Sequence, residues 1–228
     1  MSEWGPPVTA SIEVSVKSGS VEIRVADVAS PTLKSGKATI DGSGVVHSDP
    51  SSSVTLLCPR GTNVVIGTHS GSVSCSGALG RVAIATHSGS VSVEQCTSAD
   101  IRTATGSVTV GAVAGECRAN SKSGHVAVER APWCDVHTVS GSVEIGGVRD
   151  GTVHCASGSV EVECQGPGHL DVHTISGKVT LTYPTGVSPA IELHGSAGRV
   201  DNSLTPTVET LGSASITTVS GRVRLRSA

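Results

Sequence analysis

Aromatic residues are almost absent from this chain. Its 228 residues include no phenylalanine, one tyrosine (Tyr183) and two tryptophans (Trp4 and Trp133). Proteins that stack nucleic-acid bases, or that hold sugars in grooves, depend on aromatic side chains, so the scarcity counts against both classes. Hydrophobic residues still make up 37% of the chain. The composition is therefore that of a folded protein whose core is built from small aliphatic side chains.

Strong charge, long apolar runs and paired cysteine motifs are missing too. The net charge of −3, from 16 basic and 19 acidic residues, lacks the positive field of a nucleic-acid binder. No apolar stretch approaches the roughly 20 residues of a membrane span, and the start, MSEWGPPVTA, has no secretory pattern. The seven cysteines form no C-x-x-C pair, which favours reduced structural thiols. We expect a cytoplasmic protein with no membrane span and no nucleic-acid partner.

An internal repeat organises the sequence, and such a repeat decides the fold class. Segments such as THSGSVSC, TVSGSVEI and TVSGRVRL align on a glycine that recurs at spacings of 18, 17, 18, 17, 17, 19, 21 and 23 residues. The nine aligned glycines are Gly71, Gly89, Gly106, Gly124, Gly141, Gly158, Gly177, Gly198 and Gly221. A further copy, VKSGSVEI, surrounds Gly19.

Apolar residues alternate with polar ones on both sides of this glycine. The second residue after it is valine in all nine copies, and the fifth residue before it is always aliphatic. The third residue before it is Thr or Ser in seven of the nine. Alternation with a period of two predicts half-buried β-strands, and no stretch shows the period of 3.6 that marks a helix. Each repeat therefore predicts two short strands joined at an S-G corner, where glycine tolerates a positive φ.

Two strands per repeat fit either a hairpin meander or a parallel solenoid. Identical residues recur at identical phase, as in the threonine series Thr68, Thr86, Thr103, Ser121 and Thr138. In a solenoid such residues stack about 4.8 Å apart, and inward hydroxyls would then reach their neighbours. We therefore predict an all-β, single-domain parallel β-solenoid with about 17–19 residues per rung, where a rung is one turn of the coil.

The expected single domain covers residues 1–228, with irregular rungs at 1–60, regular SGSV repeats at 61–182 and C-terminal rungs with longer loops at 183–228. Its two facing sheets leave a gap of about 10 Å, which Val, Ile and Thr fill and a ring would overfill. Trp4, Trp133 and Tyr183 are accordingly expected outside the inner rungs.

The repeat resembles a known family. The series T-x-S-G-S-V-x-V, the segment VTLLCPRGT at Val54–Thr62 and the C-terminal GRVDNSL are similar to the bacterial putative-adhesin repeat family, a domain of unknown function related to adhesin-head β-helix modules. The resemblance covers almost the whole chain. It implies that the β-helix is right-handed, and it implies no catalytic residues.

A column of histidines is the most informative polar feature. His137, His154, His173 and His194 each stand four residues before a repeat glycine, at a position that alternation places outside. Two residues before them stand Asp135, Thr152, Asp171 and Glu192. Stacked imidazoles with nearby carboxylates suggest a weak zinc or nickel site, or a pH-sensitive patch. A solvated face of mutually offsetting charges is the simpler interpretation, because open, flat sites bind metal weakly.

No other chemistry emerges from the sequence. Nucleophile-elbow, phosphate-loop, dinucleotide, HExxH and calcium-repeat motifs are absent. Glu144 and Glu161 lie one repeat apart and could form an acid/base pair, although two glutamates stacked on a sheet are more often solubilising charge. In the final strand Arg222, Arg224 and Arg226 alternate outward. On a terminal rung they would oppose end-to-end stacking or, alternatively, form a docking site for an acidic partner.

We therefore expect a non-enzymatic, adhesin-like scaffold with no cofactor and an unknown protein partner, either monomeric or self-associating end to end. The alternative is a carbohydrate-active or metal-dependent β-helix enzyme.

Overall fold

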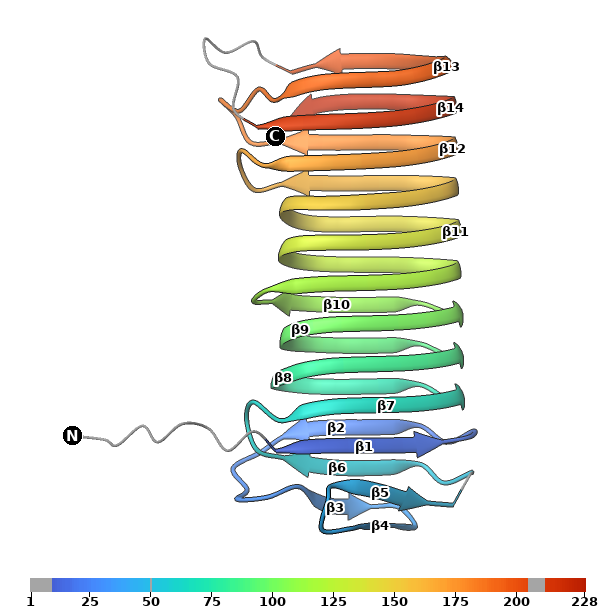
Figure 1. Cartoon of the computed structure of the whole chain (residues 1–228), viewed down its shortest axis with the longest axis vertical. Helices are drawn as coiled ribbons and strands as arrows, with labels where there is room; N and C mark the ends of the chain where they lie inside the picture. Colours follow the sequence, from blue (N-terminus) through green and yellow to red (C-terminus); the bar gives the residue numbers. More distant parts are fainter. Residues whose placement is uncertain (1–9, 50, 205–211) are drawn as a thin grey trace, which may run out of the picture.

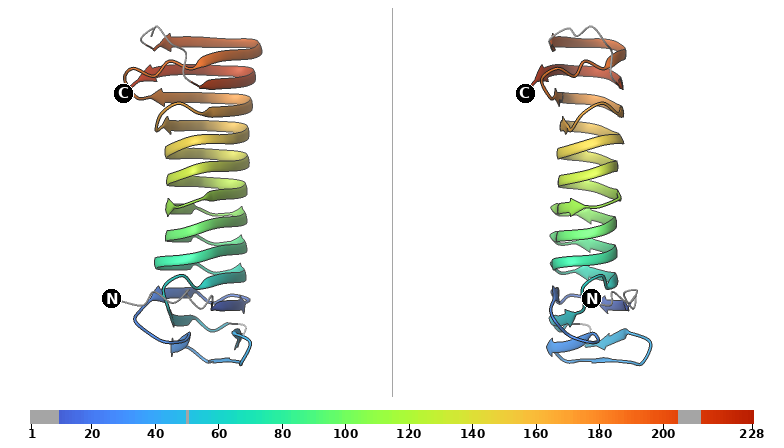
Figure 2. Two further views of the ribbon diagram at one scale, coloured as in Figure 1. Left: turned by 60° about the vertical axis from the view of Figure 1, so that its left-hand side comes forward. Right: turned by 90° about the vertical axis from the view of Figure 1, so that its left-hand side faces the viewer.

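The protein is a long coil of β-strands (Figures 1 and 2). The computed structural model describes residues 10–49, 51–204 and 212–228, and these residues contain strands and no helix. The first six strands are short: β1 (Ser11–Val16), β2 (Val21–Val25), β3 (Thr32–Ser35), β4 (Ala38–Ile40), β5 (Val45–Ser48) and β6 (Val54–Cys58). The later strands mostly run on through the corners of the coil: β7 (Asn63–Ser70), β8 (Val73–Ser88), β9 (Val91–Thr105), β10 (Val108–Val113), β11 (Glu116–Cys164), β12 (His169–Tyr183), β13 (Ala190–Ser203) and β14 (Ser213–Ser227).

Successive rungs pair in parallel at the repeat spacing. Ile66 of β7 lies beside Ile84 of β8, and Ile84 lies beside Ile101 of β9. Val160 of β11 lies beside Val179 of β12 in the same way. Residues of equal phase therefore stack as ladders, as the sequence predicts for a solenoid and not for a meander. All fourteen strands join one continuous sheet.

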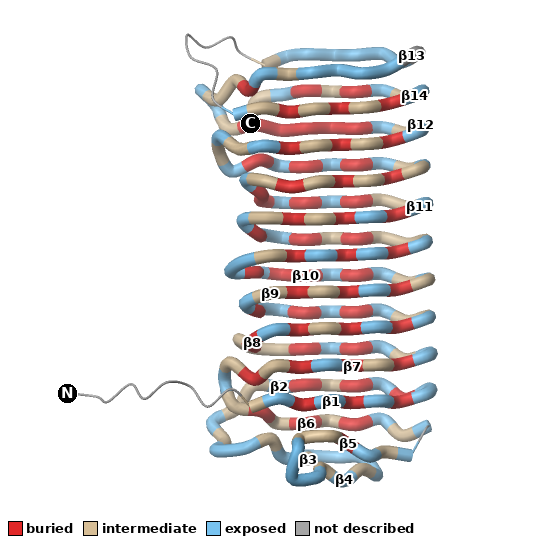
Figure 3. Tube along the Cα trace, in the orientation of Figure 1, coloured by how far each residue is buried: buried red, intermediate tan, exposed pale blue. Residues whose placement is uncertain are grey.

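The interior of a rung is filled by six small side chains. In one rung of β11 these are Cys134, Val136, Thr138, Val143, Ile145 and Val148, all of them buried. Figure 3 shows the same alternation of buried and exposed residues from one rung to the next. The core is thus a narrow column, and its stability comes from contacts between neighbouring rungs.

The glycine corner is set by a close approach between rungs. A Cβ atom on Gly141 would run into the carbonyl oxygen of Gly124, and one on Gly158 into that of Gly141. Six of the repeat glycines also have positive φ, for example +142° at Gly141 and +145° at Gly158. The expected positive φ is confirmed there, and the stacked backbones impose a second requirement for glycine.

The threonine series is buried as expected, but its hydroxyls do not reach the neighbouring rung. The Thr103 hydroxyl donates to the carbonyl oxygen of Thr105 at 3.2 Å, and the Ser121 hydroxyl donates to that of Ser123 at 3.2 Å. Each bond stays within its own rung, at the start of the S-G corner. The expected ladder of hydroxyls is therefore wrong, because the bend offers a nearer carbonyl than the adjacent rung does.

At both ends of the coil, the order of rungs in space departs from their order in the sequence. The rung of β1 and β2 lies between that of β7 and β8 on one side and that of β5 and β6 on the other. At the other end β14 lies between β12 and β13. The last strand is therefore not the edge strand, and the expected terminal position of its arginines is wrong.

Two of these arginines, Arg224 and Arg226, instead pair with neighbouring rungs. Arg224 of β14 pairs with Asp201 of β13 at 3.6 Å. Arg226 reaches past β12, donating to the hydroxyl of Thr182 and pairing with Glu161 at 2.9 Å. Their contribution is to fix β14 in place as an inner rung.

One of the three aromatic positions differs from expectation. Tyr183 is only 3% exposed and belongs to the core, so its expected place outside the inner rungs is wrong. It lies at the end of β12, where the neighbouring rung places Cys164 at the equivalent position, and this small residue leaves space for the ring. Trp133 is half-buried beneath the guanidinium of Arg118, 5.7 Å from the ring centre. Trp4 lies outside the described residues.

Candidate functional site

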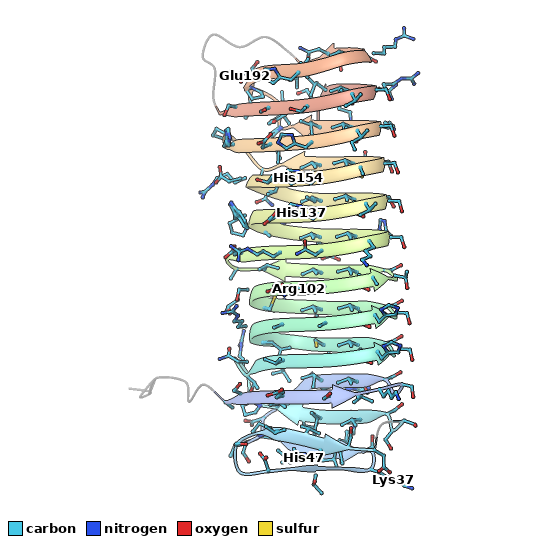
Figure 4. All side chains as sticks on the ribbon, turned by 45° about the vertical axis from the view of Figure 1, so that its right-hand side comes forward. Lys37, His47, Arg102, His137, His154 and Glu192 are labelled. Atoms are coloured by element: carbon cyan, nitrogen blue, oxygen red, sulfur yellow. The ribbon has the colours of Figure 1, made fainter. Side chains whose placement is uncertain are left out.

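Three histidines of the predicted column stack face to face. The ring centres of His137 and His154 lie 4.4 Å apart, and those of His154 and His173 lie 4.7 Å apart. The planes of each pair are within 13° of parallel. Figure 4 shows His137 and His154 on successive rungs of one face, with Arg102 on the same face further along the coil. β11 and β12 pair in parallel and place His154 beside His173, and His137 holds the same phase one repeat earlier within β11.

His194 lies outside this stack. Thr217 of β14 pairs with His173 on one side and with His194 of β13 on the other. A rung without histidine therefore separates His194 from the other three, and the expected run of four successive histidines is wrong. Glu192 lies beside Ser215 and is likewise separated from Asp171.

Carboxylates accompany three of the four histidines. Asp135 lies 2.9 Å from His137, Asp171 lies 3.2 Å from His173, and Glu192 lies 3.9 Å from His194. Each pair joins residues two apart on one strand, which face the same side.

His154, which follows Thr152, has no such partner. Burial lowers its pKa from the ordinary value of 6.5, and the positive charges of His137 and His173 lower it further. His154 is therefore harder to protonate than an ordinary histidine.

The stacked geometry bears directly on the metal hypothesis. The lone pairs of an imidazole lie in its ring plane, so parallel stacked rings direct them side by side rather than toward one point. In the described part of the chain, no group of three or more His, Cys, Asp or Glu side chains is arranged to hold a metal ion. Weak zinc or nickel binding at His137, His154, His173 and their aspartates stays a prediction.

A groove that no sequence motif predicts lies beside the histidine stack. Its volume is about 650 Å³ and it crosses β7, β8, β9 and β11. Five basic side chains and no carboxylate line it. We call it the basic groove, with basic residues His87, Arg102, Lys122, His137 and His154.

The floor of the basic groove is the threonine series, where each strand bends into its S-G corner. Among the described residues, Lys122 and His87 have no ion-pair partner, whereas Arg102 pairs with Asp100 at 3.2 Å. The signal that could have revealed the groove is the outward position four before the glycine, which Arg102 and Asn120 share with the histidines.

The two glutamates considered as an acid/base pair lie beside basic side chains. Glu161 pairs with Arg226 at 2.9 Å, and Glu144 lies 3.9 Å from His125. Neither carboxylate is among the residues that line the basic groove. A glycosidase needs two carboxyl groups facing one cleft, and these two do not provide that arrangement.

The seven cysteines are all free and buried. Burial raises the pKa of Cys58, Cys75 and Cys96 to about 12. Thiols that hold their protons so firmly are poor nucleophiles. The structure shows seven free, buried thiols, and their reduced structural role stays a prediction.

No helix suited to crossing a membrane occurs within residues 10–49, 51–204 and 212–228.

Comparison with known proteins identifies a family. No curated protein matches the chain. Among solved structures, a putative adhesin from Bacteroides fragilis NCTC 9343 aligns with 93% of this chain and 90% of its own, at 12% identity and a TM-score of 0.48. A putative cell adhesion protein from Clostridium sporogenes ATCC 15579 aligns with 97% of this chain and 95% of its own, at 8% identity and a TM-score of 0.26. The model of the Toastrack DUF4097 family matches residues 6–202, and the chain therefore belongs to this family of unknown function.

Proposed function

We propose that the protein is a non-enzymatic, adhesin-like scaffold whose basic groove binds an acidic segment of a partner protein. The observation that carries the proposal is the groove itself, an elongated hollow lined by five basic side chains and no carboxylate. The right-handed winding implied by the family resemblance stays a prediction.

The shape of the groove suits an extended chain better than a small molecule. It runs across several rungs of a stiff, flat surface and is lined by side chains from four strands. Small-molecule sites usually enclose most of their ligand, whereas solenoids offer long surfaces along which a partner can lie. The absence of phenylalanine and the scarcity of other aromatic residues favour a polypeptide over a carbohydrate chain.

Arg102 and Lys122 are the permanently charged groups that line the groove, and Lys122 in particular favours an acidic partner. Lys122 and His87 have no ion-pair partner among the described residues, and Lys122 is exposed. Asp100 and Asp135 pair with Arg102 and His137 from the neighbouring outward position and do not line the groove. An acidic chain would therefore meet donors along the groove, and its attraction would weaken with added salt.

The test is a titration with a fluorescein-labelled oligoglutamate peptide, followed by fluorescence anisotropy at low salt. We expect Arg102→Glu/Lys122→Glu to weaken binding by about tenfold or more, because two contacts become repulsive. Arg130→Glu is the matched control, since Arg130 is exposed on the other strand of its rung and does not line the groove. Equal loss with the control, or no loss with the double variant, would contradict the proposal.

A further inference from the structure

The two ends of the coil differ in how their outermost rung is covered. At one end β3 pairs antiparallel with β6, and β4 pairs antiparallel with β5. These short strands cover the first parallel rung (Figure 1). At the other end lies β13, which pairs with β14 on its inner side. In the described part of the chain no strand pairs with the outer side of β13.

The open end exposes apolar side chains at core positions. Leu193 and Val200 of β13 stand at the inward phase, yet they are 40% and 47% exposed. Their partners in β14, Ile216 and Val223, are at most 1% exposed. Figure 3 shows β13 as exposed along almost its whole length, unlike the rungs beneath it. A strand edge that is unpaired among residues 10–49, 51–204 and 212–228, and that lies beside exposed apolar core positions, invites another strand.

The symmetry of the rung indicates which strand fits. Leu193 lies two residues before Gly195, and Val200 lies two residues after Gly198, so the two residues are equally far from the corner that joins their strands. The corner divides β13 into one segment around Leu193 and one around Val200. If a two-fold axis passes through both residues, each segment lies antiparallel to the same segment of a second copy. Both halves of the rung would then pair at once, and the two apolar ends would cover each other.

The charges of β13 suit this arrangement. With Leu193 on the axis, Glu192 lies opposite His194 of the second copy. With Val200 on the axis, Arg199 lies opposite Asp201 of the second copy. All four side chains are exposed. Opposite charges thus face each other around Leu193 and around Val200. If all these side chains had the same sign of charge, pairing two copies of β13 would bring like charges together and be repulsive.

We propose that the protein forms a closed homodimer in which two copies of β13 pair antiparallel about Leu193 and Val200. The contact uses the same surface, the β13 edge, on both copies, so the dimer leaves no free β13 edge. The other end of each copy is covered by antiparallel strands, so the assembly stops at two chains and does not grow into a filament. The end of one rung buries only a small area, so the dimer should be weak and should form only at high protein concentration. It does not involve the basic groove and stands independently of the proposed ligand.

Sedimentation equilibrium of the full chain, from micromolar concentrations up to about 1 mM, tests the proposal. We expect a monomer–dimer equilibrium that Leu193→Asp abolishes. Circular dichroism of each variant shows whether the monomer has kept its strands.

A charge swap then tests the pairing itself. His194→Glu places glutamate opposite glutamate on both sides of Leu193, leaves the strand pair around Val200 unchanged, and should weaken the dimer about tenfold or more. Glu192→Arg/His194→Glu reverses both charges and should restore the dimer.

Three results would overturn the proposal: a chain that stays monomeric at every concentration, a dimer that survives Leu193→Asp, or growth into species larger than a dimer. Arg102→Glu/Lys122→Glu leaves β13 unchanged and should dimerise normally, so loss of peptide binding and loss of the dimer are separate results.

Discussion

Replacing Gly158 by alanine should destabilise the protein far more than an ordinary glycine substitution. Gly158 has a φ of +145°, a region that residues with a Cβ rarely adopt. Its added methyl group would also run into the carbonyl oxygen of Gly141 in the preceding rung. Backbone strain of this kind costs about 1–3 kcal/mol.

The backbone clash adds to this strain. The atom in the way belongs to the main chain and not to a flexible side chain, so relief requires two rungs to move apart at the corner. Separating the rungs weakens backbone hydrogen bonds worth about 1 kcal/mol each. Together the two effects predict a loss of roughly 3–5 kcal/mol, a large share of the stability of a typical domain.

The measurement is urea unfolding followed by far-ultraviolet circular dichroism. Gly166→Ala is the matched control, because Gly166 has no positive φ and a Cβ there would have no atom within 4 Å. The control should stay within about 1 kcal/mol of the unmodified protein. If Gly158→Ala were as stable as Gly166→Ala, the close approach of the rungs could not be the reason for the repeat glycine.

Three further predictions concern the core and the histidine stack. Ile145→Ala removes most of a fully buried side chain and should cost about 3 kcal/mol in the same urea assay, whereas Ile145→Val should cost about 1 kcal/mol. An NMR titration should find the pKa of His154 below 6.5 and should find it raised in His173→Ala, since one neighbouring charge is gone. A depressed pKa means that the unfolded chain binds more protons, so His154 should lower stability as pH falls through 6.5, and His154→Ala should reduce that loss. Calorimetric titration with Zn²⁺ should show weak binding heat that His137→Ala removes, and no heat in the unmodified protein would refute the predicted site.

Most of the regular part of the fold follows from the sequence alone. Val143 and Ile145 alternate with polar residues, and the same phase recurs in every repeat. Such a pattern buries one side of each strand and favours parallel stacking of like residues. The stacking of His137, His154 and His173 follows from the same phase, because neighbouring repeats become neighbouring rungs. Glycine at the corner was also predictable, although only the structure shows how closely the corners approach.

The sequence determined the rung, and the tertiary structure decided the order of the rungs at the ends and the shape of the surface. The longer spacings of 21 and 23 residues before Gly198 and Gly221 allow the chain to pass over one rung and return, but they do not reveal which path it takes. Because β14 enters between β12 and β13, His194 leaves the histidine stack and β13 becomes the open edge. The basic groove depends on side chains from four strands, so it exists only once the coil is stacked. The alternation of buried and exposed residues depends on local sequence, whereas the order of the rungs and the basic groove depend on contacts between segments that are distant in the sequence.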